Sequence, residues 1–358
     1  MLRTCACLMF ALLAGAGSGS ARAAPPIAPP DPGIDGLMRD YDGQVPGAAV
    51  LVLHDGNPVF RRGYGLAELE QATAVTPQTN FRLASVSKQF TAAAILLLAE
   101  DGRLSIDDPL KRWLPGLPAA AEQITLRHLL SHTSGLLDYE DLMDPADSRQ
   151  VHDSDVLQLL QREDRTYFAP GSQYRYSNSG YALLALVVGQ ASGMDFASFL
   201  QQRIFQPLGM TGTVAHQDGV DEVAHRAYGH SLVDGRWQRT DQSTTSAVLG
   251  DGCIYSSIDD LARWDATLYD GRLLSRASLQ QMFSPSTPTP EPDVPSYGFG
   301  LRLNGKAQWH SGESIGFRNV ILRYPDQRLT VIVLTNRNNP EPYPTALRIA
   351  QRWLDVLQ

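Results

Sequence analysis

The chain has 358 residues, of which 43% are hydrophobic and 19% charged, and its formal net charge at pH 7 is −8. This length suffices for one large domain, or two closely packed ones, with a substantial core. The acidic balance and the lack of any basic run argue against nucleic-acid binding, which needs a concentrated basic face.

The first residues have the pattern of a secretory signal. Arg3 supplies a charged start, Cys7 to Ala16 is a short apolar run, and Ala21-Arg22-Ala23 fits a small-x-small cleavage site. We therefore expect a signal peptide over residues 1–23 and an exported protein, periplasmic or secreted, that begins near Ala24. The apolar run is too short for a membrane anchor, and no later stretch is long and apolar enough to span a bilayer. The Pro-rich stretch that follows predicts a linker over 24–36.

After the linker, a strand pattern is followed by a helix pattern. Residues 48–53 are wholly apolar and predict a buried strand, and Asp55-Gly56 turns the chain back into a second strand over 58–64. A segment rich in helix formers then runs from Ser85 to near Gly102. Because this segment is apolar on every side, we expect its helix to be buried.

Ser85 and Lys88 stand three residues apart at the start of this helix and so share one face. The only other lysines, Lys111 and Lys306, have no serine three positions before them. Burial penalises an ammonium more than an amine, which favours transfer of the serine proton to the lysine and makes the serine a nucleophile. The free N–H groups of a helix N-terminus suit an oxyanion at the attacked carbonyl. The alternative interpretation makes Ser85 an N-cap and Lys88 a solvent-exposed side chain.

The sheet pattern returns late in the chain. Hairpins are predicted over 297–310, with a turn at Asn304-Gly305, and over 319–335, with a turn at Pro325-Asp326-Gln327. A closing helix is predicted over 344–357. Hairpins form antiparallel sheets, so the predicted fold class is α+β: an antiparallel sheet flanked by helices in an α/β-type sandwich.

The middle of the chain has a different hydrophobic pattern. From 106 to 244 the apolar spacing is mostly helical, as in 155–162 and 181–204, and polar loops separate the pieces. We therefore expect an all-helical domain over 106–244, inserted into a sheet-and-helix domain that combines 37–105 and 245–358. The active site is predicted between the two domains.

The segment Tyr176-Ser177-Asn178 lies in a loop before a helix of this middle region. An ammonium nearby helps a phenol to lose its proton, so Tyr176 is a candidate proton shuttle. Asn178 offers both a donor and an acceptor and can hold an amide. The alternative for Tyr176 is an ordinary loop tyrosine.

The segment His310-Ser311-Gly312 ends the return strand of the 297–310 hairpin. An edge strand can pair with an extended substrate, and Gly312 allows a backbone to come close. His310 is a candidate to donate a hydrogen bond, or a proton, near neutral pH.

The ordered motifs Ser-x-x-Lys, Tyr-x-Asn and basic residue-x-Gly together resemble those of the serine β-lactamase and penicillin-binding D,D-peptidase superfamily, in its class C-like branch. Segments 129–136, 207–210 and 316–318 support this resemblance, which runs from about residue 37 to 358. It implies a β-lactamase/transpeptidase-like fold. It also implies a serine hydrolase that forms an acyl-enzyme on a small-molecule or short-peptide substrate, without a cofactor or metal.

The resemblance assigns a role to each matching residue. The catalytic groups that it implies are Ser85 as the nucleophile, Lys88 as its partner and Tyr176 as the proton-transfer group. The substrate-binding residues that it implies are Asn178, His310, Ser311 and Gly312. The oxyanion hole that it implies consists of the backbone N–H groups of Ser85 and Glu313.

One position departs from the family pattern. Class C β-lactamases have a lysine where this chain has His310, and a histidine is mostly neutral at pH 7. This favours a D-amino-acid peptidase, carboxypeptidase or esterase over an efficient β-lactamase. Two alternatives stay open: a class C β-lactamase, and a non-hydrolytic penicillin- or wall-peptide-binding protein. The sequence encodes neither the physiological substrate nor the oligomeric state in a readable form.

Three other candidate groups are less favoured. Residues 312–316 fit the G-x-S-x-G nucleophile elbow, but no histidine follows Ser314, and a strand pattern follows where a helix is needed. Cys253 is predicted to be a small buried residue and not a nucleophile. His128 and His132 stand four apart without the carboxylate of a metalloprotease, so we expect structural roles for them.

Overall fold

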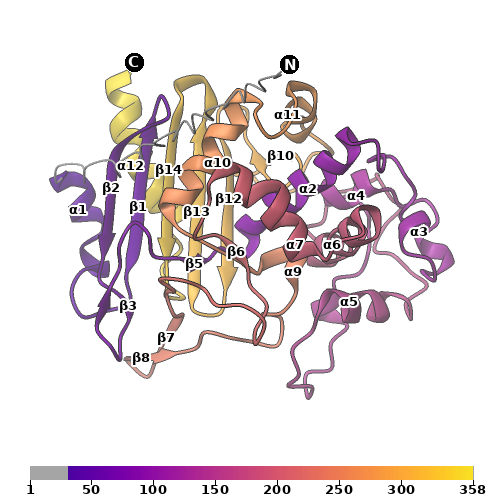
Figure 1. Cartoon of the computed structure of the whole chain (residues 1–358), viewed down its shortest axis with the longest axis horizontal. Coiled ribbons are helices and arrows are strands. Elements are labelled where there is room, and N and C mark those ends of the chain that lie inside the picture. The colour runs from indigo at the N-terminus through magenta and orange to yellow at the C-terminus, as the bar shows by residue number, and fades with distance from the viewer. Residues whose placement is uncertain (1–30, 358) are drawn as a thin grey trace, which may run out of the picture.

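The computed structural model describes residues 31–357, so the predicted signal peptide and most of the predicted linker lie outside the described residues. A seven-stranded antiparallel sheet in the order β10-β11-β12-β13-β14-β1-β2 forms the centre of the protein (Figure 1). Strands from the two ends of the chain meet where β1 pairs with β14, from Ala48–Thr335 to His54–Leu329. The strands of this sheet are β1 (Ala48–His54), β2 (Asn57–Tyr64), β10 (Ser296–Tyr297), β11 (Arg302–Leu303), β12 (Gln308–Ser314), β13 (Phe317–Tyr324) and β14 (Leu329–Thr335).

Helices cover both faces of this sheet, because alternate side chains of a strand point to opposite faces and here both sets are apolar. Val50 and Val52 of β1 belong to the apolar cluster that includes Ile349 of α12, whereas Leu51 belongs to the cluster that includes Trp264 of α10. The predicted α+β class with an antiparallel sheet is therefore confirmed. The helices are α1 (Pro32–Leu37), α2 (Lys88–Glu100), α3 (Leu110–Trp113), α4 (Leu126–Leu130), α5 (Asp153–Leu160), α6 (Asn178–Ser192), α7 (Phe196–Leu200), α8 (Gln206–Leu208), α9 (Leu249–Gly252), α10 (Ile258–Asp270), α11 (Arg276–Met282) and α12 (Tyr343–Leu357).

The inserted region lies beside the sheet, and Figure 1 shows α3 to α7 gathered there. It differs from the prediction in two ways. The helix expected over 181–204 is interrupted, because Gly193 caps α6 in the left-handed conformation (φ 75°) and Asp195 caps the next helix. The second half of the region is also not all helical, because it contains the short strands β6 (Val214–Ala215), β7 (His230–Val233) and β8 (Arg236–Arg239). The other short strands of the protein lie outside this region and are β3 (Leu66–Glu68), β4 (Thr73–Ala74), β5 (Phe81–Arg82) and β9 (Ile254–Ser256).

The predicted linker extends too far into the folded protein. Asp31 accepts hydrogen bonds from the N–H groups of Gly33 and Ile34, and Pro32 occupies the first turn, so a short helix begins here. Ile34 is fully buried against the sheet. Among residues 31–357, no single helix is long and apolar enough to cross a membrane. Only the bent pair Asn178–Ser192 and Phe196–Leu208 reaches that length and composition.

Candidate active site

Ser85 lies in a tight turn that the sequence predicted as the first turn of an α-helix. Ala84–Ser87 form a 3-10 turn, and α2 itself begins at Lys88. Ala84 has φ 49°, a left-handed conformation that costs free energy in a residue with a side chain. From Lys88 to Leu98 every residue of α2 is buried, as its apolar composition predicted. The turn leaves Ser85 half-buried at the wall of a pocket.

Lys88 is fully buried and holds three acceptors at once. Its Nζ donates to Ser85 Oγ at 3.0 Å, to Asn178 Oδ1 at 2.8 Å and to the Asp251 carbonyl at 3.0 Å. An ammonium has three protons, so this set satisfies it completely. The Ser85 hydroxyl and the Lys88 nitrogen are therefore within direct proton-transfer distance.

Tyr176 lies against Lys88, whose Nζ is 5.0 Å from the centre of the Tyr176 ring. Its hydroxyl is buried and has no hydrogen-bond partner within the described part of the chain. The loop is held by His132, which accepts from the Ser177 N–H at 3.1 Å and lies against Tyr176 with ring centres 4.3 Å apart and the rings tilted by 37°. Burial, with the nearby Lys88 charge, lowers the pKa of His132 well below its usual value, so this ring is neutral. The sequence singled out His132 only as half of a histidine pair, and the structure assigns it a positioning role.

His310, the first residue of the third motif, does not lie in the surroundings that the sequence predicted for it. His310 is fully buried, with Nδ1 2.6 Å from the Ser311 carbonyl and Nε2 2.9 Å from the Tyr297 hydroxyl. Burial, reinforced by the charges of Arg302 and Lys88, lowers the pKa of His310 well below its usual value. A neutral ring fits these partners, since Nδ1–H donates to the carbonyl and Nε2 accepts from Tyr297. Both nitrogens are thus occupied by the protein, and His310 supports the strand from behind where a substrate contact was expected.

Ser311 and Gly312 also make contacts within the protein. The Ser311 hydroxyl accepts from Nη1 of Arg302 at 2.7 Å. A Cβ atom at Gly312 would lie 2.0 Å from the Leu83 carbonyl oxygen, so only glycine fits at this position. The backbone that comes close to Gly312 is therefore the segment that leads into the Ser85 turn.

The backbone N–H of Glu313 points away from β13. Ser314 pairs with Phe317 across a two-residue turn, so these two residues exchange both ladder hydrogen bonds. Bonded and unbonded pairs alternate along an antiparallel ladder, which makes Glu313–Arg318 an unbonded pair. Because Gly312 abuts the Ser85 turn, the Glu313 N–H is presented on the side of Ser85.

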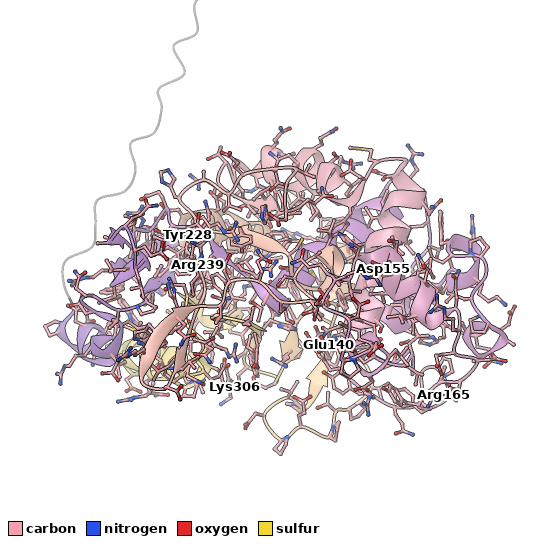
Figure 2. The ribbon with its side chains drawn as sticks, turned by 90° about the horizontal axis from the view of Figure 1, so that it is seen from below. Glu140, Asp155, Arg165, Tyr228, Arg239 and Lys306 are labelled. Carbon is pink, nitrogen blue, oxygen red and sulfur yellow. The ribbon has the colours of Figure 1, made fainter. Side chains whose placement is uncertain are left out.

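Acidic groups surround the Lys88 ammonium. Glu140 accepts from Nδ2 of Asn178 at 3.0 Å, and Asp138 accepts from the Asn178 backbone N–H at 2.9 Å. Burial raises the pKa of both carboxyl groups, and it raises the pKa of Asp251 to about 7 against the opposing effect of Lys88. Figure 2 shows Glu140 where the sheet side and the helical side of the protein meet. Sequence reasoning missed these carboxyl groups, because no motif links them to Lys88.

The pocket at this junction brings Ser85, Asn178 and Glu313 together with Glu140 and Arg82. It thus combines residues from the sheet side and from the inserted region, where the active site was predicted. The roles assigned to Ser85, Lys88, Tyr176 and the oxyanion N–H groups remain predictions. The observed positions of these groups are compatible with them.

The less favoured candidates lie in other surroundings. Ser314 is the last residue of β12, and after a two-residue turn the antiparallel strand β13 follows it, where a nucleophile elbow requires a helix. Cys253 is fully buried, and burial raises the pKa of its thiol well above the usual value. Nδ1 of His128 accepts from the Thr125 N–H at 3.3 Å in the cap of α4.

Comparison with known proteins defines the class. The beta-lactamase family model matches residues 34–352, so this chain belongs to the beta-lactamase family, and the resemblance seen in the motifs is confirmed. The chain is 35% identical over 317 residues to penicillin-binding protein 4* of Bacillus subtilis, covering 83% of this chain and 70% of that protein. It is 34% identical over 312 residues to the D-aminopeptidase of Brucella anthropi, covering 84% of this chain and 57% of that protein.

The solved structures agree with this assignment. The structure of a penicillin-binding protein from Bacillus halodurans superposes with a TM-score of 0.77 at 27% identity, covering 90% of this chain and 98% of that one. Family and relatives together define a hydrolase of the serine acyl-enzyme type. The chain spans less than two thirds of the length of the D-aminopeptidase.

Proposed function

We propose that this protein hydrolyses amide bonds of D-amino-acid peptides, or small esters, through an acyl-enzyme on Ser85. The observation that carries the proposal is the 3.0 Å contact between Lys88 Nζ and Ser85 Oγ, with Ser85 at the wall of a pocket. The similarity to a D-aminopeptidase supports the choice of substrate class.

The chemistry follows from the contacts. Ser85 Oγ attacks the carbonyl carbon and its proton passes to Lys88, while the Lys88 ammonium gives one of its own protons to Tyr176 in its phenolate form. The tetrahedral oxyanion accepts hydrogen bonds from the N–H groups of Ser85 and Glu313, each typically worth about 3 kcal/mol of the barrier. Tyr176 returns a proton to the leaving amine or alcohol as the C–N or C–O bond breaks. Water then repeats the sequence and releases the acid and free Ser85.

The neutral His310 argues against efficient β-lactam hydrolysis. A lysine at this position would attract the carboxylate of a penicillin, whereas a buried uncharged imidazole with both nitrogens occupied does not. We therefore expect penicillins to acylate Ser85 slowly, if they react, and to leave slowly.

A substrate panel read by intact mass tests the proposal. Purified protein is given short-chain nitrophenyl esters, nitrocefin and D-Ala-D-Ala peptides, and hydrolysis and covalent adducts are recorded. We expect turnover of the esters or peptides, and an acyl adduct that disappears in Ser85→Ala but persists in Ser314→Ala. An adduct that persists in Ser85→Ala would refute the assignment, and peptide binding without any adduct would favour the non-hydrolytic binding protein.

A further inference from the structure

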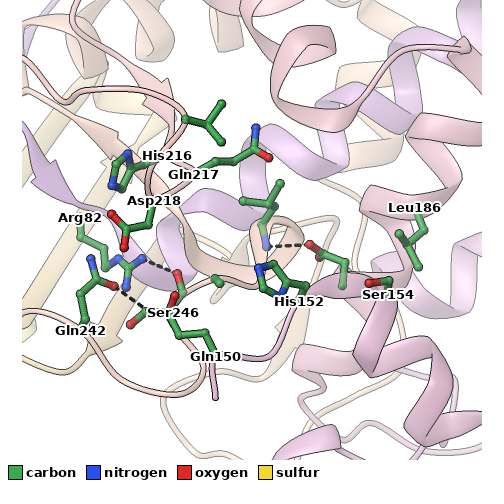
Figure 3. A pocket seen from close by; sticks show the side chains of 14 residues that line it. Arg82, Gln150, His152, Ser154, Leu186, His216, Gln217, Asp218, Gln242 and Ser246 are labelled. Atoms are coloured by element: carbon green, nitrogen blue, oxygen red, sulfur yellow. Dashed lines mark hydrogen bonds between the residues drawn. The ribbon is translucent and has the colours of Figure 1, made fainter. Parts of the chain in front are cut away.

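A cavity of about 390 Å³ lies next to the pocket of Ser85 (Figure 3). Arg82 and Ser246 line both spaces, so the two are neighbours across this pair of residues. Figure 3 shows Arg82 and His216 on one side of the cavity and His152 with Leu186 on the other. The position of Arg82 is set by β5, which pairs Arg82 with Tyr255 of β9, and it stands three residues before the nucleophile.

Arg82 is a buried cation without an anion. Arg82 is 3% exposed, Nη2 donates to the Ser246 carbonyl at 2.5 Å, and Nε is buried without a partner in the described part of the chain. Within residues 31–357, no carboxylate oxygen lies within 4.0 Å of its guanidinium nitrogens. By contrast, the buried Arg61 and Arg323 each have a carboxylate partner, Asp259 and Asp265. A buried charge costs free energy unless it is paired, so binding of an anion next to Arg82 would be favourable.

A second unpaired nitrogen lines the same cavity. His216 is 5% exposed, its Nδ1 lies 2.5 Å from Oδ1 of Asp221, and its Nε2 is buried without a partner among the described residues. The two acidic residues of the lining do not neutralise Arg82. Asp153 uses its carboxylate to accept from the N–H groups of Leu249 and Gly250, and Asp218 is exposed at the rim.

We propose that Arg82 is a specificity-determining residue that binds a carboxylate on the acyl part of the substrate. The inference rests on the proposed function, and it narrows the substrate class to acyl groups that carry an anionic group and reach from Ser85 toward the Arg82 cavity. A guanidinium presents N–H groups in a fork that matches a carboxylate, which a single backbone carbonyl does not fill.

Matched esters test the inference. The 4-nitrophenyl monoesters of adipic acid and of its monoamide, adipamic acid, have the same size and differ in one charge. Because a hydrogen bond to a charged group is worth about 10- to 100-fold in binding, we expect the wild-type kcat/KM to favour the adipyl ester by that factor. The ratio of the two kcat/KM values should fall to near 1 in Arg82→Gln and be intermediate in Arg82→Lys. It should rise in Asp218→Asn, which removes the carboxylate at the rim. A ratio does not depend on the fraction of folded enzyme, so a loss of stability in Arg82→Gln does not obscure the result.

A second measurement is independent of turnover. Free adipate should raise the Tm of the wild-type protein and of Ser85→Ala, and should have less effect on Arg82→Gln. A wild-type ratio near 1, an unchanged ratio in Arg82→Gln, or equal Tm shifts in all three proteins would overturn the inference. If Ser85-dependent hydrolysis occurs without any preference for the anion, only this inference fails. If no ester is hydrolysed and no adduct forms, the proposed function fails, and the Tm shifts still decide whether Arg82 binds the anion.

Discussion

Replacing Gly312 by alanine should reduce kcat strongly, because the added methyl group would drive β12 away from the Ser85 turn. The new Cβ would lie 2.0 Å from the Leu83 carbonyl oxygen, where contacts below 3.0 Å essentially never occur. The two segments must therefore separate by about 1 Å. Leu83 is followed closely by Ser85, and Gly312 directly by Glu313, so the separation falls on the two N–H groups of the predicted oxyanion hole.

The size of the effect follows from this displacement. A misplacement of 1 Å in an active site can cost about 100-fold in rate, and loss of one oxyanion donor costs about 100- to 1,000-fold. We expect kcat to fall by about 100- to 1,000-fold, together with roughly 1–3 kcal/mol of stability from overpacking.

A matched variant separates the two effects. Gly63→Ala on β2 places its Cβ 2.2 Å from the Val75 carbonyl, a similar clash in a part of the sheet remote from the pocket. Nitrophenyl ester hydrolysis is measured for both variants well below their Tm, with Tm from thermal unfolding. Gly63→Ala should lose stability and keep kcat. If Gly312→Ala kept a kcat within threefold of wild type, or if the two variants lost activity equally, Glu313 would not form the oxyanion hole.

Three further outcomes are expected. Tyr176→Phe should slow formation of the Ser85 adduct by about 100-fold, the usual scale for a lost proton-transfer group, and an unchanged single-turnover rate would remove Tyr176 from the mechanism. Asp251 has a folded-state pKa of about 7 against 3.8 for the free carboxyl group, so the folded protein keeps a proton that the unfolded chain releases, and stability falls as the pH rises through this window. The free energy of unfolding of Asp251→Asn relative to that of wild type should therefore rise by roughly 3 kcal/mol between pH 5 and pH 8 in urea unfolding, and a pH-independent difference between the two proteins would contradict this. Asn319→Ala should lower the free energy of unfolding by about 2–5 kcal/mol, because the buried amide donates to the Arg82 carbonyl at 2.7 Å and accepts from the Thr335 N–H at 3.1 Å. A change below about 0.5 kcal/mol would show that these groups find other partners.

Local sequence signals predicted most of the sheet. The apolar run and the Asp55-Gly56 turn place β1 and β2 within one residue of their observed bounds, and β14 and the closing helix agree equally well, whereas β13 begins two residues before the predicted 319. These elements are specified by residues next to one another, through turn chemistry and alternation. The short strands β6 to β8 were missed, because two to four residues carry too little periodicity.

The site was only partly predictable for a different reason. Ser85 and Lys88 lie within one turn, so their contact follows from spacing alone. The third acceptor of Lys88 is the Asp251 carbonyl, 163 positions away, and the sequence gives no signal for a backbone atom at that separation. The burial of His310 was likewise missed, since its neighbours Tyr297 and Arg302 approach it only through the fold of the hairpin.

The pairing of β1 with β14 has a consequence for the order in which the chain matures. Ser85 is synthesised 228 residues before Glu313, and β14, which completes the sheet, comes later still. Until β14 docks, one edge of β1 has no partner and the nucleophile turn has no β12 to pack against. Pairing over such a separation is slow, because the chain must close a long loop before it gains any contact. If the proposed function holds, a chain truncated before β12 therefore carries a Ser85 that cannot be acylated efficiently, and reactivity toward acyl donors appears only after the two distant segments have packed together.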